Sequence, residues 1–166
     1  MYRRLAPAVV GYLTARGVDD PEAITQDVFL ALLPRLATAH GGEAGISTLL
    51  FSIAHARSVD HHRRRTRNPV TVEYATDDDP RVTPSAEERV LGSAANSPVV
   101  AMLSTLPSEQ REVLLLRIVA DLPIESVATI MEKTAGAVKQ LQRRALLALK
   151  SGLSTEPHAT TNGSAA

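Results

Sequence analysis

The sequence contains no cysteine and very few aromatic residues. Without cysteine it can form neither disulfides nor thiolate metal sites, which fits the reducing cytoplasm. Aromatics make up 3% of the 166 residues, so the core must be built mainly from Leu, Val, Ile and Ala, which suits helices. No apolar run reaches membrane-spanning length, and the first residues, MYRRLAPAVV, lack the apolar core of a signal peptide. We therefore expect a cytoplasmic protein without membrane insertion.

The net charge is zero, so the total charge points to no polyanionic partner. The distribution is more informative, because the segment from 57 to 67 holds five arginines against one acid, Asp60. Residues 69–84 carry three prolines and the run Asp77-Asp78-Asp79, which predicts a flexible acidic linker. The segment 151–166 is rich in Ser, Thr and Gly and lacks periodicity, which predicts a disordered tail. We expect two domains, 1–68 and 85–150, which move independently unless they pack on each other.

Apolar residues recur at helical spacing throughout both halves, and no segment reads as a strand. In the first half we expect three helices. The first covers residues 2–16, the second runs from a cap at Asp20 to a break near Pro34, and the third covers 46–65. A flexible loop at 40–45 should precede the third helix. Short helices are expected at 85–91 and 99–106. The sequence therefore predicts an all-α protein of two small helical domains.

Residues 106–150 read as three consecutive helices, the last two joined by a short turn. Pro107 and Pro123 suit first helical turns, and Thr134 suits the N-cap of the third helix. Val138 and Ala145 belong to the buried side of that helix, whose other side carries Lys139, Gln140, Arg143 and Arg144. This is the arrangement of a helix-turn-helix, in which the second helix of the motif enters a DNA groove. An ordinary solvated basic surface is the plain alternative.

Small residues open the third helix, where backbone N–H groups can approach a phosphate closely. Arg and Gln side chains can read guanine and adenine edges, respectively. The expected DNA-binding residues of this domain are Thr134, Ala135, Gly136, Lys139, Gln140, Arg143 and Arg144.

The C-terminal part of the sequence resembles the promoter-binding C-terminal domain of bacterial sigma factors. The resemblance is carried by the run LP-xx-RE-VLLLR, followed by V-A-x-I-M and then by G-x-VK with a trailing RRA. It is most similar to the small extracytoplasmic-function (ECF) group of the sigma-70 family. Three segments of the N-terminal half are similar in order and spacing to the helices of that group's promoter-melting domain. They are MYRRLAPAVVGYL, DDPEAITQDVFLALL and ISTLLFSIAHARSVDHHRRR. The resemblance implies a factor that binds core RNA polymerase and starts transcription, reading the minus-35 element as duplex and opening the minus-10 element.

By the same resemblance, residues 40–67 would hold the unpaired minus-10 strand. The residues implied are Ser52, His55, Asp60, His61, Arg63, Arg64, Arg65 and Arg67. Ala56 departs from the family, which often has an Arg-Asn pair where this chain has His55-Ala56, and an alanine cannot hydrogen-bond a base. The exposed side of the second helix would dock on the polymerase through Gln26, Asp27, Leu30 and Arg35. An anti-sigma protein that clamps both domains is the usual regulator in the family.

Enzymatic signatures are poor. The five histidines have no Cys partners, and the sequence lacks H-E-x-x-H, a Gly-rich phosphate loop and G-x-S-x-G. We expect no catalysis, cofactor or metal. Two other classes of protein stay open from the residues alone. One is a stand-alone helix-turn-helix regulator whose N-terminal bundle senses a ligand or dimerises, and the other is a module that only sequesters other regulators.

Overall fold

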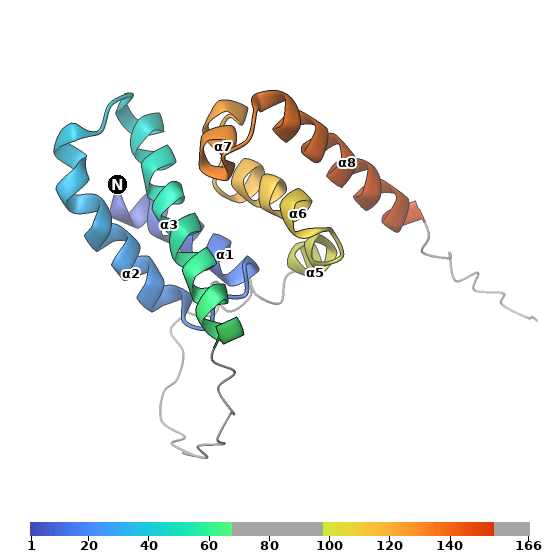
Figure 1. Cartoon of the computed structure of the whole chain (residues 1–166), viewed down its shortest axis with the longest axis horizontal. Coiled ribbons are helices and arrows are strands. Elements are labelled where there is room, and N and C mark those ends of the chain that lie inside the picture. The colour runs from blue at the N-terminus through green and yellow to red at the C-terminus, as the bar shows by residue number, and fades with distance from the viewer. Residues whose placement is uncertain (68–97, 155–166) are drawn as a thin grey trace, which may run out of the picture.

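The computed structural model describes residues 1–67 and 98–154 of the chain (Figure 1). Within these residues the regular structure is all helical, without a strand, as the sequence predicted. The helices are α1 (Tyr2–Ala15), α2 (Pro21–Leu32), the 3-10 helix η1 (Leu33–Thr38), α3 (Gly42–Arg67), α5 (Pro98–Ser104), α6 (Ser108–Leu114), the π-helical turn η2 (Leu115–Val119), α7 (Ile124–Met131) and α8 (Ala135–Ser154). The expected linker and the short helix at 85–91 lie outside the described residues.

Local sequence explains most helix boundaries in the first half. Gly17 ends α1 with φ +72°, a left-handed conformation that glycine adopts readily. The Asp20 side chain caps α2 by accepting a hydrogen bond of 3.0 Å from the N–H of Ala23. Pro34 has no N–H to donate, and the α-helical geometry changes to 3-10 geometry at Leu33. These three expectations are confirmed.

Helix α3 begins four residues earlier than predicted, so the expected loop at 40–45 is wrong from Gly42 onward. Gly41 and Gly42 have φ values of +89° and +60°, and these left-handed residues turn the chain directly into the helix. The N–H of Gly45 donates to the Gly41 carbonyl at 3.2 Å, which closes the first turn. Glu43 lies in that turn, where its negative charge interacts favourably with the positive end of the helix dipole and stabilises the helix. Its carboxylate also pairs with Arg4 of α1. The connection from η1 is therefore short.

The C-terminal half forms the expected helix-turn-helix, with two corrections. The helix after Pro107 does not continue as a regular α-helix, because Leu115–Val119 form a π turn in which the N–H of Ala120 bonds the Leu115 carbonyl at 3.2 Å. Helix α8 runs to Ser154, so the first residues of the predicted tail are helical. Between α7 and α8, Glu132 is left-handed with φ +54°, and Thr134 caps α8 through a 3.1 Å hydrogen bond from the N–H of Ala137.

One continuous apolar core runs through both halves of the described structure. Tyr12 and Phe51 meet edge to face at its centre, with ring centroids 5.7 Å apart. Helix α1 packs against η2, and α3 packs against α7, so the first half rests directly on the helix-turn-helix (Figure 1). The two domains expected from the sequence are thus in contact rather than separate.

Candidate nucleic-acid interface

The N-terminal half of α8 presents the cationic surface that the sequence predicted. Val138 and Ala145 are fully buried beneath it. The expected DNA-binding residues lie on the outer side, where Ala135 is half-buried and the other six are exposed. Among the described residues, Lys139, Gln140, Arg143 and Arg144 have no hydrogen-bond or ion-pair partner. Their polar groups are therefore available to a ligand.

Helix α8 is held in place by polar contacts as well as by its apolar face. The guanidinium of Arg117 donates to the Gln142 side chain at 3.3 Å and also to the carbonyl of Leu122. At the other end, Gly136 is exposed, and a Cβ built on it would meet only Thr134 Oγ1 at 4.0 Å. The fold itself therefore does not require a glycine there. The bare backbone instead leaves the first turn of α8 open to a close neighbour.

The outer side of α3 brings only part of the predicted minus-10 set together. Ser52 and Asp60 line a hollow of about 220 Å³ with Ala56 between them and Arg35 of η1 opposite. Further along the helix, Arg63, Arg64 and Arg67 are exposed and have no polar partner among the described residues. A shallow hollow followed by free cations is the kind of surface that single-stranded nucleic acid uses.

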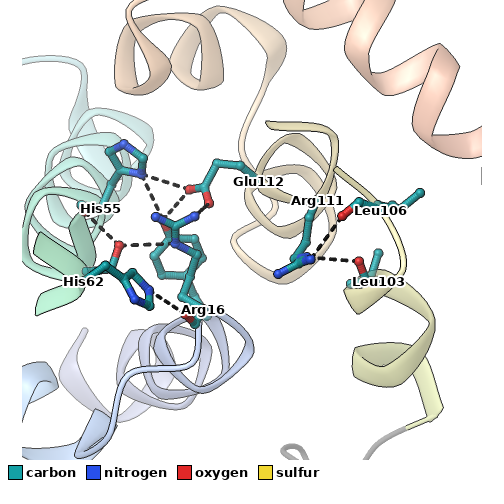
Figure 2. A network of polar contacts seen from close by, with 9 residues as sticks. Arg16, His55, His62, Leu103, Leu106, Arg111 and Glu112 are labelled. Carbon is teal, nitrogen blue, oxygen red and sulfur yellow. Dashed lines mark hydrogen bonds and ion pairs between the residues drawn. The ribbon is translucent and has the colours of Figure 1, made fainter. Parts of the chain in front are cut away.

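The rest of the minus-10 set contacts other parts of the protein. The His61 ring and the Arg65 guanidinium both contact the Asp19 carboxylate, at 3.1 and 2.9 Å. His55 points the other way, toward the C-terminal half, where its Nδ1 lies 2.9 Å from Glu112 Oε1 (Figure 2). The eight residues therefore do not form one surface.

The side chains assigned to polymerase contact lie on the outer side of α2 and on η1. Gln26, Asp27 and Arg35 are exposed, and Leu30 is 64% exposed, an unusual position for a leucine in a helix. Leu33, which was not among the expected contact residues, is 60% exposed and lies one turn further along. Its i, i+3 spacing from Leu30 was a usable signal, and the two make an apolar strip with polar neighbours.

A buried polar cluster around Glu112 was not foreseen. Its carboxylate accepts hydrogen bonds from the Tyr12 hydroxyl and from His55, and Arg16 Nη1 lies 2.7 Å from its second oxygen (Figure 2). Burial raises the pKa of Glu112, but the His55 hydrogen bond, the Arg16 charge and the Tyr12 hydrogen bond outweigh it and lower the pKa from its ordinary value. Burial and the Glu112 charge raise the pKa of Tyr12 well above 10.0. A signal was present, since Glu112 precedes buried Leu116 by four residues and so shares its helix face.

The described residues contain no group of three or more His, Cys, Asp or Glu side chains able to hold a metal ion. Within the same ranges, no helix combines the length and the hydropathy needed to cross a membrane.

Comparison with known proteins matches both halves of the chain. The family model for region 4 of sigma-70 factors matches residues 102–151. The chain is 30% identical over 132 residues to the ECF RNA polymerase sigma factor ShbA of Streptomyces griseus, covering 78% of this chain and 69% of that protein. It is 28% identical over 155 residues to the ECF RNA polymerase sigma factor SigD of Mycobacterium tuberculosis, covering 88% and 72% of the two chains.

Solved structures show the same fold. One is the sigma factor RpoE in complex with the anti-sigma factor NepR from Bartonella quintana, with a TM-score of 0.69, 20% identity and coverage of 94% of this chain and 96% of that one. Another is CnrH in complex with the cytosolic domain of CnrY, with a TM-score of 0.62, 19% identity and coverage of 94% and 86%. The chain belongs to the extracytoplasmic-function sigma factors of the sigma-70 family.

Proposed function

We propose that this sigma factor binds core RNA polymerase through α2, reads the minus-35 element with α8 and holds the opened minus-10 strand with α3. The observation that carries the proposal is the outer face of α8. On that face, the side chains of four residues are exposed and without a partner in the described structure: Lys139, Gln140, Arg143 and Arg144. Side chains left free on a helix whose opposite face is fixed in a core are suited to an external ligand.

The minus-35 role follows from the dimensions and chemistry of α8. The major groove of B-DNA admits an α-helix, and recognition helices contact bases through their N-terminal residues. Thr134 and Gly136 mark that end of α8, where free backbone N–H groups favour a phosphate. We assign Arg143, Arg144 and Gln140 to base edges and Lys139 to the DNA backbone.

The minus-10 role rests on the outer side of α3. Unpaired DNA is held by cations along its backbone and by pockets for single bases. Arg63, Arg64 and Arg67 supply free cations, and the hollow between Ser52 and Asp60 offers room near Arg35. We assign the strand to this side of α3, with His55 excluded as long as it contacts Glu112.

The polymerase contact is assigned to the strip formed by Leu30 and Leu33, with Gln26 and Asp27 at its rim. A small apolar centre with a polar edge is the usual make-up of a protein interface. Since RpoE and CnrH were solved with NepR and CnrY bound, we also propose an anti-sigma protein as a partner of this chain. These activities place the protein in the cytoplasm and require no catalysis by it.

Run-off transcription with purified core polymerase tests the function. On promoter fragments, the wild-type chain should give defined transcripts that polymerase alone does not. Leu30→Glu should abolish both the transcripts and co-purification with polymerase. Leu153→Glu is the matched control, because Leu153 is 61% exposed at the far end of α8. Normal transcription by Leu30→Glu would contradict the α2 assignment.

A gel shift without polymerase separates this function from that of a stand-alone regulator. The free chain has zero net charge, so its DNA affinity should remain near non-specific levels until polymerase joins both DNA contacts on one scaffold. Nanomolar, sequence-specific binding of duplex DNA by the chain alone, with a stable dimer on a palindrome, would instead establish the regulator.

A further inference from the structure

Glu112 is an acid from one half of the molecule whose polar partners all come from the other half. Its side chain is 3% exposed on α6. Tyr12 from α1, Arg16 at the end of α1 and His55 from α3 surround the carboxylate (Figure 2). Because a carboxylate only accepts hydrogen bonds, His55 must carry a proton on Nδ1 to donate to it. The cluster therefore joins the N-terminal helices to α6 of the C-terminal half.

The partners are themselves fixed by the first half. Arg16 Nε lies 3.3 Å from Ser58 Oγ, and the Arg16 carbonyl accepts from His62 Nε2 at 2.7 Å. Tyr12 is fully buried against Phe51. The donors are thus also held by contacts that do not involve Glu112, and donors held in place are the condition under which a buried charge is well compensated.

Two other contacts between the halves are chemically weaker. Thr48 of α3 donates to Ser126 of α7 at 2.8 Å. Gly11 of α1 faces Val119 of η2, where a Cβ would lie 3.7 Å from a methyl group. These contacts add packing and one neutral hydrogen bond, so the charged part of the interface is concentrated at Glu112.

The packed arrangement cannot span the two promoter elements. By their names these elements lie about 25 base pairs apart, which is about 85 Å along B-DNA at about 3.4 Å per base pair. The longest helix, α3, has 26 residues and is about 39 Å long. Helices α3, α7 and α8 pack successively on one another. Two surfaces linked by direct helix packing stay closer than the DNA requires, so the halves must separate before both elements are bound.

We propose that Glu112 with Tyr12, Arg16 and His55 forms a latch that holds the free chain closed and must open when the chain joins polymerase and promoter. The opening step rests on the proposed function, because it requires polymerase and promoter. The closed state is a property of the free protein alone.

The chemistry makes the latch reversible. On separation, Glu112 and Arg16 regain water, and this hydration offsets most of the lost attraction. Removing one partner of the cluster while the halves stay packed has another effect, because the remaining charges are then buried without compensation and the closed state is destabilised. Removal of the Glu112 charge should therefore shift the population toward the open form without unfolding either half. A closed fraction reduces the apparent affinity of every ligand that needs the open form.

Energy transfer between two dyes tests the closed state directly. The chain contains no cysteine, so Ala23→Cys on α2 and Ala148→Cys on α8 place dyes at two exposed positions outside the proposed contacts. The otherwise wild-type chain should show high transfer without polymerase. Glu112→Gln and Tyr12→Phe should each lower the transfer while circular dichroism stays unchanged. Tyr12→Phe removes only the hydroxyl and keeps the ring on Phe51, which separates loss of the latch from loss of the fold.

Glu109→Gln is the matched control. Glu109 lies on the same helix, is 57% exposed and pairs with Lys133 at 2.7 Å, so its removal should leave transfer unchanged. Equal transfer in the wild type, Glu112→Gln and Tyr12→Phe overturns the latch. Low transfer in the wild type, or equal opening by Glu109→Gln, also overturns it.

Titration of the factor into a fixed amount of core polymerase, with run-off transcription as the readout, tests the consequence. Glu112→Gln should reach half-maximal initiation at a lower factor concentration, by about fivefold or more, the lower end of usual coupling between two states. An unchanged titration with clear opening by energy transfer would overturn the coupling. Failure of the wild type to initiate at all would count against the proposed function alone, because the transfer measurement needs neither polymerase nor promoter.

Discussion

Helices α3 and α8 both carry rows of cations, but the protein uses them differently. On α3, Arg65 and two histidines are bound to acids of other elements, and a third histidine to a carbonyl. On α8, Lys139, Arg143 and Arg144 have no such partners in the described structure. The difference shows that a basic run does not by itself define a nucleic-acid surface. Cations that also hold the fold together are only partly available, whereas Lys139, Arg143 and Arg144 make no polar contact with the described residues.

The largest expected effect comes from the core side of α3. Phe51 is fully buried and packs edge to face on Tyr12 of α1. Phe51→Ala should lower the free energy of unfolding by about 3–5 kcal/mol through lost burial and a new cavity. Leu146→Ala on α8, where the side chain is 48% exposed, should change it by less than about 0.5 kcal/mol. Chemical denaturation of both variants measures the free energy of unfolding. Equal losses in the two variants would show that the core side of α3 contributes no more to stability than the exposed side of α8.

The next effect separates binding from stability on α8. Replacing a base-reading arginine by alanine should cost about 1–3 kcal/mol of DNA binding and relax specificity at one position. We expect Arg143→Ala with Arg144→Ala to abolish transcription from a minus-35-dependent promoter while the thermal midpoint is unchanged. Lys139→Ala should weaken all sequences alike and flatten the salt dependence. Normal transcription by the double variant would show that α8 does not read this element.

A smaller effect should appear in acid. The lowered pKa of Glu112 means that its contribution to stability is present above about pH 4.5, its ordinary value, and is lost as pH falls through the lowered value. The wild type should therefore lose thermal stability more steeply than Glu112→Gln in this range. Glu109→Gln should follow the wild type. Parallel pH profiles for the wild type and Glu112→Gln would show that the carboxylate does not stabilise the closed state.

The smallest effect should come from freeing the cations of α3. Asp19 is 65% exposed in its pairs with Arg65 and His61, and such surface pairs contribute about 0.2–1 kcal/mol. Asp19→Asn should leave folding almost unchanged but raise non-specific affinity for single-stranded DNA at low salt. Fluorescence anisotropy with a labelled oligonucleotide measures this, with Asp20→Asn as a neighbouring charge control. Equal affinity would mean that Arg65 plays no part in binding.

The sequence predicted the features that local chemistry controls. The caps at Asp20 and Thr134, the break at Pro34 and the free face of α8 depend on residues within a few positions of each other. It failed where the cause is distant or subtle. Tyr12 and Glu112 are separated by 100 positions, so no local pattern could join them. The early start of α3 was missed because the two glycines suggested a loop, while their left-handed geometry led into the helix instead.

The π turn at Leu115–Val119 allows this chain to carry one residue more than a regular helix would need without misaligning the elements on either side. The wide turn lies between Glu112 and the helix-turn-helix and takes up the extra residue locally. Deleting one residue within it should restore a regular α-helix and leave α7 and α8 facing as before. Deleting one residue from a regular turn of α6 would instead rotate the following part of that helix by about 100°. The surplus residue therefore marks a point between the two halves at which a change of length is tolerated.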